Sequence, residues 1–224
     1  MATIQVINLI ARAANIAQDQ TNIRWPQSEW LDWLNDAQRE VVLLKPQASV
    51  KNESVKLLPG STKQSIPANG IQLIDIPRNM GSTGSTAGTA IRITAREVLD
   101  AQVPTWHIDA NAAPIKHYCF DPRDPKTFYV YPKAPATDWY VECIYAANPT
   151  DCSLGGIIQL DDIYANALLN LMLHRAYGKD AEYAQNAQLS TAYYQAAMQS
   201  LGVKTQNEAA SNPNNALGNP NVVK

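Results

Sequence analysis

The sequence predicts an α+β fold: a four-helix bundle formed by the N- and C-terminal segments, with an inserted β-rich domain and an extended C-terminal tail. Three observations support this. Apolar residues recur at helical spacing near both ends of the 224-residue chain, short β-branched runs fill the middle, and residues 205–224 follow neither pattern. Helices at both ends can share one core if the middle segment folds as a separate domain between them.

Two helices are expected at the N-terminal end. Over residues 4–17, apolar side chains are spaced three or four apart. The second helix begins near Pro26 and Ser28, carries acidic residues in its first turn, and stops at Pro46. Its apolar positions form a single stripe, consisting of Trp30, Leu34, Ala37, Val41 and Leu44.

The middle of the chain is rich in proline, glycine and β-branched residues, which is typical of short strands. The predicted strands are residues 54–58, 72–76, 91–94, 117–121, 127–131 and 139–146, with a short helix over 96–102. Residues 121–126 contain two aspartates and two prolines, so the strands on either side should form a hairpin. In the last strand, Trp139, Val141, Cys143 and Tyr145 alternate onto one face.

Helical spacing returns after Gly155 and Gly156. Asp161 or Asp162 is predicted to cap a helix that is apolar on most sides and therefore central. Gly178 is predicted to follow its C-terminus, and Asp180 to cap a last helix that ends near Leu201. The predicted boundaries are 1–48 for helices 1 and 2, 49–152 for the inserted domain, 153–203 for helices 3 and 4, and 204–224 for the tail.

The tail is rich in asparagine, proline and alanine, and it carries almost no charge. Alone it cannot bury enough apolar surface to offset the entropy lost on ordering. We therefore expect another chain to hold it.

Overall composition excludes several classes of protein. Hydrophobic residues make up 46% of the chain, which argues against intrinsic disorder, but charged residues make up only 17%. A net charge of −2 argues against a protein that works mainly by neutralising phosphates. The three cysteines are too few and too scattered for a disulfide framework, which indicates a reducing compartment, and they form no CxxC pair of a zinc ribbon or thioredoxin-like motif. We expect neither a signal peptide nor a membrane span.

No catalytic or metal-binding pattern is evident. The Gly/Ser/Thr-rich residues 81–89 lack the lysine of a phosphate-binding loop and are expected to form a surface loop. The spacing of the possible metal ligands fits no zinc or calcium site; these are His107, Asp109, His117, Asp121 and Asp124. No nucleophile has a recognisable base beside it. We expect no enzymatic activity, no cofactor and no metal.

Aromatic residues leave two interpretations open. Trp30 and Trp33 lie on neighbouring positions of one helix, where they either pack in the core or form an interface. Trp106, Tyr129 and Tyr131 could instead form a stacking platform, as in a small carbohydrate-binding or host-interaction module.

Several short motifs, in order, resemble a family of bacteriophage head-to-tail adaptors, also called connector or head completion proteins. The match spans residues 3–201 and includes Arg24-Trp25-Pro26, Trp33-Leu34-Asn35-Asp36-Ala37-Gln38-Arg39-Glu40, Arg78-Asn79-Met80-Gly81, Pro104-Thr105-Trp106-His107, Asp121-Pro122-Arg123-Asp124-Pro125 and Arg175-Ala176-Tyr177. Gly178 stands where a helix former is expected in that family.

The resemblance implies a structural virion protein located at the head-to-tail interface, and in the host cytoplasm during assembly. It implies a homo-oligomeric ring, usually of twelve copies, that docks beneath the portal protein, extends the DNA channel and meets a tail or nozzle protein below. DNA would pass without sequence-specific binding. On this basis we predict a portal-binding tail at Leu217, Asn219, Pro220, Val222, Val223 and Lys224, and place Trp25 and Arg39 at the subunit interface. A tail or nozzle ring component is the nearest alternative.

Overall fold

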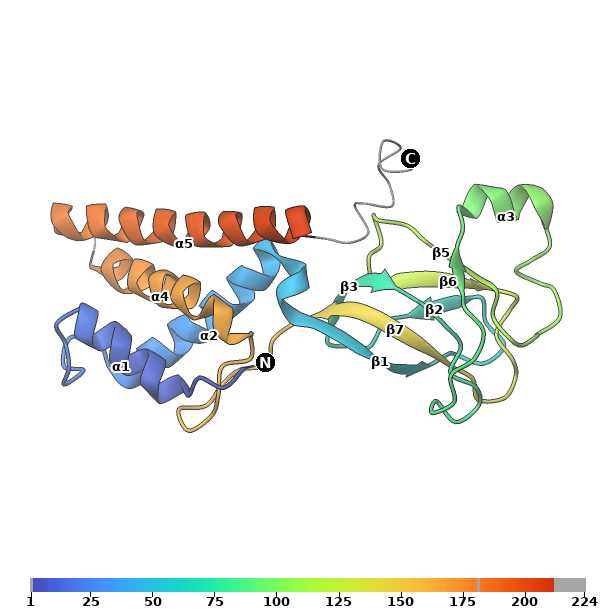
Figure 1. The fold of residues 1–224 in the computed structure, drawn as a ribbon, viewed down its shortest axis with the longest axis horizontal. Helices are drawn as coiled ribbons and strands as arrows, with labels where there is room; N and C mark the ends of the chain where they lie inside the picture. The colour runs from blue at the N-terminus through green and yellow to red at the C-terminus, as the bar shows by residue number, and fades with distance from the viewer. Residues whose placement is uncertain (1, 181, 212–224) are drawn as a thin grey trace. The chain divides into compact units, whose positions relative to one another are not determined.

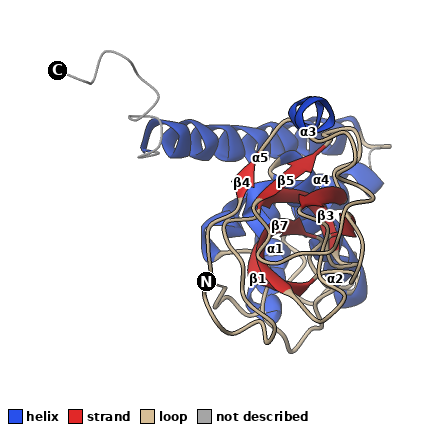
Figure 2. Ribbon diagram, turned by 90° about the vertical axis from the view of Figure 1, so that its right-hand side faces the viewer, coloured by secondary structure: helices blue, strands red, loops and turns tan. Residues whose placement is uncertain are grey.

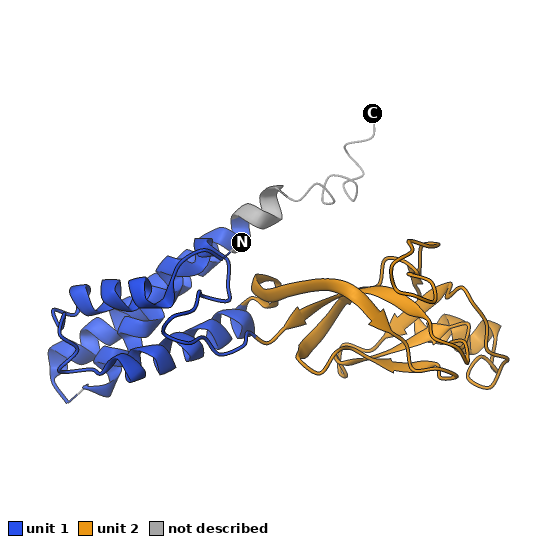
Figure 3. Cartoon of the chain, turned by 90° about the horizontal axis from the view of Figure 1, so that it is seen from below, with its two compact units in different colours: residues 1–44, 149–224 blue, residues 45–148 orange. Residues whose placement is uncertain are grey.

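The computed structural model describes residues 2–180 and 182–211, and the chain divides into two compact units (Figure 3). The first unit contains residues 1–44 and 149–224, and the second contains residues 45–148. The described residues form five α-helices and two β-sheets, which confirms the predicted α+β class (Figures 1 and 2). Below, the two are called the helical unit and the β unit.

Four helices make up the helical unit, together with the 3₁₀ turn η2 (Asp162–Tyr164): α1 (Val6–Ile16), α2 (Gln27–Leu44), α4 (Ala165–Lys179) and α5 (Ala184–Ser211). The central helix is α4, which packs against the other three (Figure 1). Its side chains Leu168, Leu171 and Met172 are completely buried, as expected for a helix that is apolar on most sides.

The prediction that Gly178 follows the C-terminus of α4 is wrong. The helix continues through Gly178 and ends at Lys179, with Asp180 at its C-cap position. Asp180 therefore does not cap α5, which begins at Ala184. A Cβ atom added at Gly178 would lie 3.3 Å from Ser190 Oγ on α5. This glycine therefore allows α5 to approach α4 closely, a role that spacing along one helix does not show.

The last helix is longer than predicted, because α5 ends at Ser211 instead of near Leu201. Residues 203–211 contain no proline, and Gln206, Glu208, Ala209 and Ala210 are favourable in helices. The predicted tail boundary at residue 204 is thus too early. The predicted portal-binding residues lie outside the described residues.

Asp162 has a different role from the predicted helix cap. Asp161 occupies the N-cap position of η2, without a side-chain cap hydrogen bond. The Asp162 carboxylate instead accepts hydrogen bonds from the backbone N–H groups of Thr3 and Ile4, at 2.8 and 3.1 Å, and from the Thr3 hydroxyl. It therefore joins the N-terminal segment to the start of α4.

The β unit begins with the 3₁₀ turn η1 (Pro46–Ser49). Its described residues also form two sheets and one α-helix, α3 (Arg96–Gln102). One sheet has the strand order β1 (Val50–Lys56), β7 (Tyr140–Ala147) and β3 (Gly70–Asp75), all antiparallel. The other has the order β2 (Lys63–Ser65), β6 (Thr127–Tyr131), β5 (His117–Phe120) and β4 (Arg92–Ile93), with β4 parallel to β5.

Both sheets contribute side chains to one buried cluster. The expected hairpin is confirmed, since β5 and β6 pair antiparallel with His117 opposite Tyr131. On β7 the predicted face is confirmed as well, since Val141, Cys143 and Tyr145 are buried in this cluster.

Within the described ranges, none of the helices combines the length and the hydropathy needed to cross a membrane.

Candidate functional site

Trp25 lies in an aromatic cluster of the helical unit. Its side chain is 1% exposed, and its ring makes edge-on contacts with Trp30, Trp33 and Tyr177 at centroid distances of 5.5, 6.3 and 5.6 Å. The Arg24 guanidinium carbon lies 4.2 Å from the Trp25 ring centroid. Trp25, which the sequence places at a subunit interface, is therefore packed inside its own subunit.

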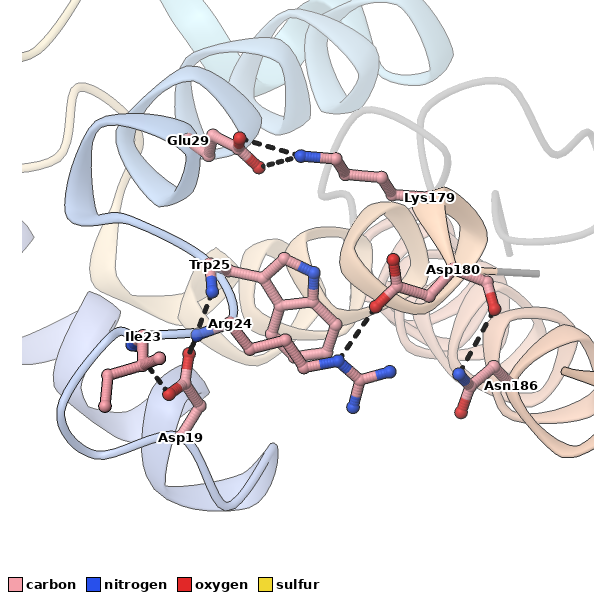
Figure 4. Close-up of polar contacts among 8 residues, drawn as sticks. All are labelled: Asp19, Ile23, Arg24, Trp25, Glu29, Lys179, Asp180 and Asn186. Atoms are coloured by element: carbon pink, nitrogen blue, oxygen red, sulfur yellow. Dashed lines mark hydrogen bonds and ion pairs between the residues drawn. The ribbon is translucent and has the colours of Figure 1, made fainter. Parts of the chain in front are cut away.

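The loop between α1 and α2 (residues 17–26) is organised by one buried carboxylate (Figure 4). Asp19 is 8% exposed and accepts backbone hydrogen bonds from Ile23, Arg24 and Trp25 at 2.9, 3.0 and 2.9 Å. Burial opposes ionisation of this carboxyl, but the three N–H donors outweigh it and hold the pKa of Asp19 below its usual range. The loop is thereby fixed in one conformation, which sets the position of Trp25.

Ion pairs join this loop and the start of α2 to the end of α4. Arg24 Nε lies 2.8 Å from the Asp180 carboxylate, and Lys179 Nζ lies 2.7 Å from both oxygens of Glu29 (Figure 4). The Asn186 amide donates to the Asp180 carbonyl at 3.2 Å, so the start of α5 is held at the same place. Because these groups are partly solvent-exposed, each pair stabilises only modestly, but together they fix three helix ends.

Arg39, the second residue predicted at a subunit interface, is engaged on the helical unit itself. Its guanidinium lies 3.0 Å from the Asp36 carboxylate and also pairs with Asp151. Both partners are exposed acids of the same subunit. The structure thus gives Arg39 a local role in holding residue 151 to α2.

Two buried amides on α2 hold the segment that returns from the β unit. Asn35 Oδ1 accepts from the backbone N–H of Cys152 at 2.8 Å, and Gln38 Oε1 accepts from that of Gln159 at 2.6 Å. Gln38 also donates to the Cys152 sulfur at 3.2 Å. The sequence pattern does not indicate this role directly, although amides three residues apart beside an apolar stripe are the available signal.

Asn79 plays a similar part in the β unit. It is almost completely buried, and its Nδ2 donates to the carbonyls of Ile115 and Thr89 at 2.8 and 3.0 Å. Its Oδ1 accepts from the Ile115 N–H at 3.0 Å and from Trp139 Nε1 at 2.9 Å. Asn79 belongs to the Arg78-Asn79-Met80-Gly81 motif, but the motif alone does not indicate this role.

The stacking-platform alternative does not fit the position of Trp106. This ring is fully buried, stacks on His107 at a centroid distance of 3.6 Å, and donates from Nε1 to Asp100 at 2.8 Å. A sugar therefore cannot reach it. The His107 ring nitrogen Nδ1 bonds to the Thr62 hydroxyl at 2.9 Å, and the described residues contain no group of three or more potential metal ligands.

These contacts define a class of protein: an α+β chain in which both ends form a helical unit and the middle segment forms an inserted β unit, with buried amides and ion pairs at its signature motifs. The family model of the SU10 adaptor protein matches residues 4–217, so the chain belongs to that family. This confirms the resemblance to phage head-to-tail adaptors. Comparison with curated proteins gives no match.

Proposed function

We propose that this chain is a structural, non-enzymatic virion protein that forms a ring beneath the portal of a tailed phage. The ring, of about twelve copies as its family resemblance implies, extends the DNA channel and connects to the next tail or nozzle protein. The observation that carries the proposal is the family match over residues 4–217, which covers nearly all of both units. In this proposal α1, α2, α4 and α5 act as the adaptor's four-helix bundle.

The charge of the chain supports this role. Proteins that bind DNA tightly neutralise its phosphates with lysine and arginine. This chain has 18 basic and 20 acidic residues, so its overall charge offers no such attraction. DNA can pass a surface of this kind without being held.

The proposal also assigns the C-terminal residues to the portal, where residues 217–224 would anchor each subunit. Deleting residues 212–224 tests this while leaving α5 whole. We expect a folded subunit that purified portal no longer captures in a pull-down, whereas a variant with the same residues scrambled serves as the control for tail length and composition. Capture of the truncated protein at wild-type affinity would contradict the anchoring role.

The same pull-down separates the alternatives. A tail or nozzle component would bind another tail protein and leave the portal unbound. A carbohydrate-binding or host-interaction module would remain monomeric and bind its ligand without any virion partner. Mass spectrometry of purified virions tests location, since an adaptor must be present in the particle.

A further inference from the structure

The solvent-facing side of α5 is unusual because it carries no charge over most of its length. Residues 184–203 include no lysine, arginine, aspartate or glutamate, whereas exposed protein surfaces are roughly 25–35% charged. Leu189 and Val203 on this side are 40% and 52% exposed. Nine of its exposed positions repeat at helical spacing along one side of the helix, namely Gln185, Gln188, Leu189, Ala192, Gln195, Gln199, Gly202, Val203 and Gln206. We call this set the α5 face.

A second neutral surface lies on α1, around a pocket of about 170 Å³. None of its lining residues is charged: aliphatic atoms come from Ile7, Ile10 and Ala11, and amides come from Asn15, Asn22 and Gln27. The Asn22 side-chain oxygen is buried and has no hydrogen-bond partner among the described residues. We call this set the α1 pocket.

The two surfaces lie on different flanks of the helical unit. The helix α4 packs against both α1 and α5 and lies between them (Figure 1). Two different patches on different flanks are what a head-to-tail contact between identical subunits requires, and such contacts close into a ring when the rotation allows it. A symmetric dimer would instead use one patch twice.

We propose that the α5 face of one copy packs against the α1 pocket of the next copy. This inference rests on the proposed ring. A second copy is the occupant that fits, since both surfaces are neutral and their contact leaves no charge buried without a partner. The glutamines of the α5 face match the exposed amides of Asn15 and Gln27 at the pocket, and an aliphatic side chain such as Leu189 matches its aliphatic wall.

Two blocking variants test the pairing. Ala192→Arg places a charge and bulk on the α5 face, and Ala11→Arg does the same beside the α1 pocket; both alanines are exposed on helices, so folding is preserved. Ala101→Arg, at an exposed alanine on α3, is the matched control. Native mass spectrometry of each protein, alone at high concentration and with purified portal, reports the number of copies per complex.

We expect Ala192→Arg and Ala11→Arg each to lose the ring and Ala101→Arg to keep it. An equimolar mixture of the two blocked proteins retains one intact face of each kind, so it should give a heterodimer and nothing larger. Absence of the heterodimer, or homodimers of either blocked variant, overturns the pairing. If wild type and both blocked variants load the portal equally, the pairing is wrong and the proposed function stands; if wild type does not bind portal, the proposed function itself fails.

Discussion

Removing the Asp19 carboxylate should destabilise the helical unit substantially. In Asp19→Ala, the backbone N–H groups of Ile23, Arg24 and Trp25 lose their acceptor together. A hydrogen bond to a charged group contributes about 1.5–3 kcal/mol. The Trp25 N–H is buried and bears this loss in full, whereas the Ile23 and Arg24 N–H groups are part-buried and can regain water. We therefore expect a total loss of about 3 kcal/mol.

Urea unfolding at pH 7, followed by tryptophan fluorescence, measures this loss, because Trp25, Trp30 and Trp33 all lie in the helical unit. Asp36→Ala is the matched control, since Asp36 is exposed and pairs with Arg39 across one helical turn, a contact of about 0.5 kcal/mol. Asp19→Asn keeps one oxygen acceptor, so its loss of unfolding free energy should lie between those of Asp19→Ala and Asp36→Ala. A loss for Asp19→Ala no larger than that for Asp36→Ala would refute the reasoning.

The dependence on pH gives a second check of the same carboxylate. Its folded-state pKa is lowered, so the unfolded chain binds a proton first as the pH falls. The stabilisation is thus fully present above the unfolded pKa, near pH 4, and is lost below it. We expect the difference in free energy of unfolding between wild type and Asp19→Ala to narrow only below about pH 4. A gap that narrows between pH 8 and 5 would assign the stabilisation to a different group.

Three further predictions concern single side chains. Asn79→Ala leaves Trp139 Nε1 without its partner and should cost the β unit about 2–4 kcal/mol in urea unfolding; a loss below about 1 kcal/mol would contradict the network. Burial, with a hydrogen bond to a carboxylate, raises the pKa of Tyr145 to about 12. The free energy of unfolding should therefore fall as the pH rises from about 10 through 12, and Tyr145→Phe should make this pH dependence weaker in an alkaline titration. Gly178→Leu should displace α5 and speed hydrogen exchange there, whereas Gly202→Leu, where a Cβ meets no neighbour, should not; equal exchange rates in the two variants would contradict the close approach.

The sequence predicted what depends on local spacing. The stripe on α2 from Trp30 to Val41, the apolar surround of α4 and the alternation on β7 follow from one-dimensional patterns, because burial imposes the period of the element. The last position of the predicted stripe is wrong, since Leu44 is 50% exposed at the end of α2. The β5–β6 hairpin was likewise predictable, since its turn residues lie between the two strands in sequence.

Contacts between distant segments were not predictable in this way. Glycine is a residue type that often ends helices, but Gly178 is explained by its close approach to Ser190 on the next helix. Aspartate is a residue type that often caps helices, yet the Asp162 carboxylate accepts a hydrogen bond from Thr3, 159 residues away in sequence. Asp19 was missed because a carboxylate bound by three backbone N–H groups needs a particular loop conformation, including positive φ at Gln18 and Asn22, that the sequence pattern does not specify.

The most direct test of the account is an image reconstruction of the chain bound to its phage portal, with the number of copies counted. We predict a closed ring of about twelve copies around the DNA channel, in which the α5 face of each copy meets the α1 pocket of its neighbour. A portal that carries no ring of this chain, or virions that lack it, would contradict the assignment as a head-to-tail adaptor.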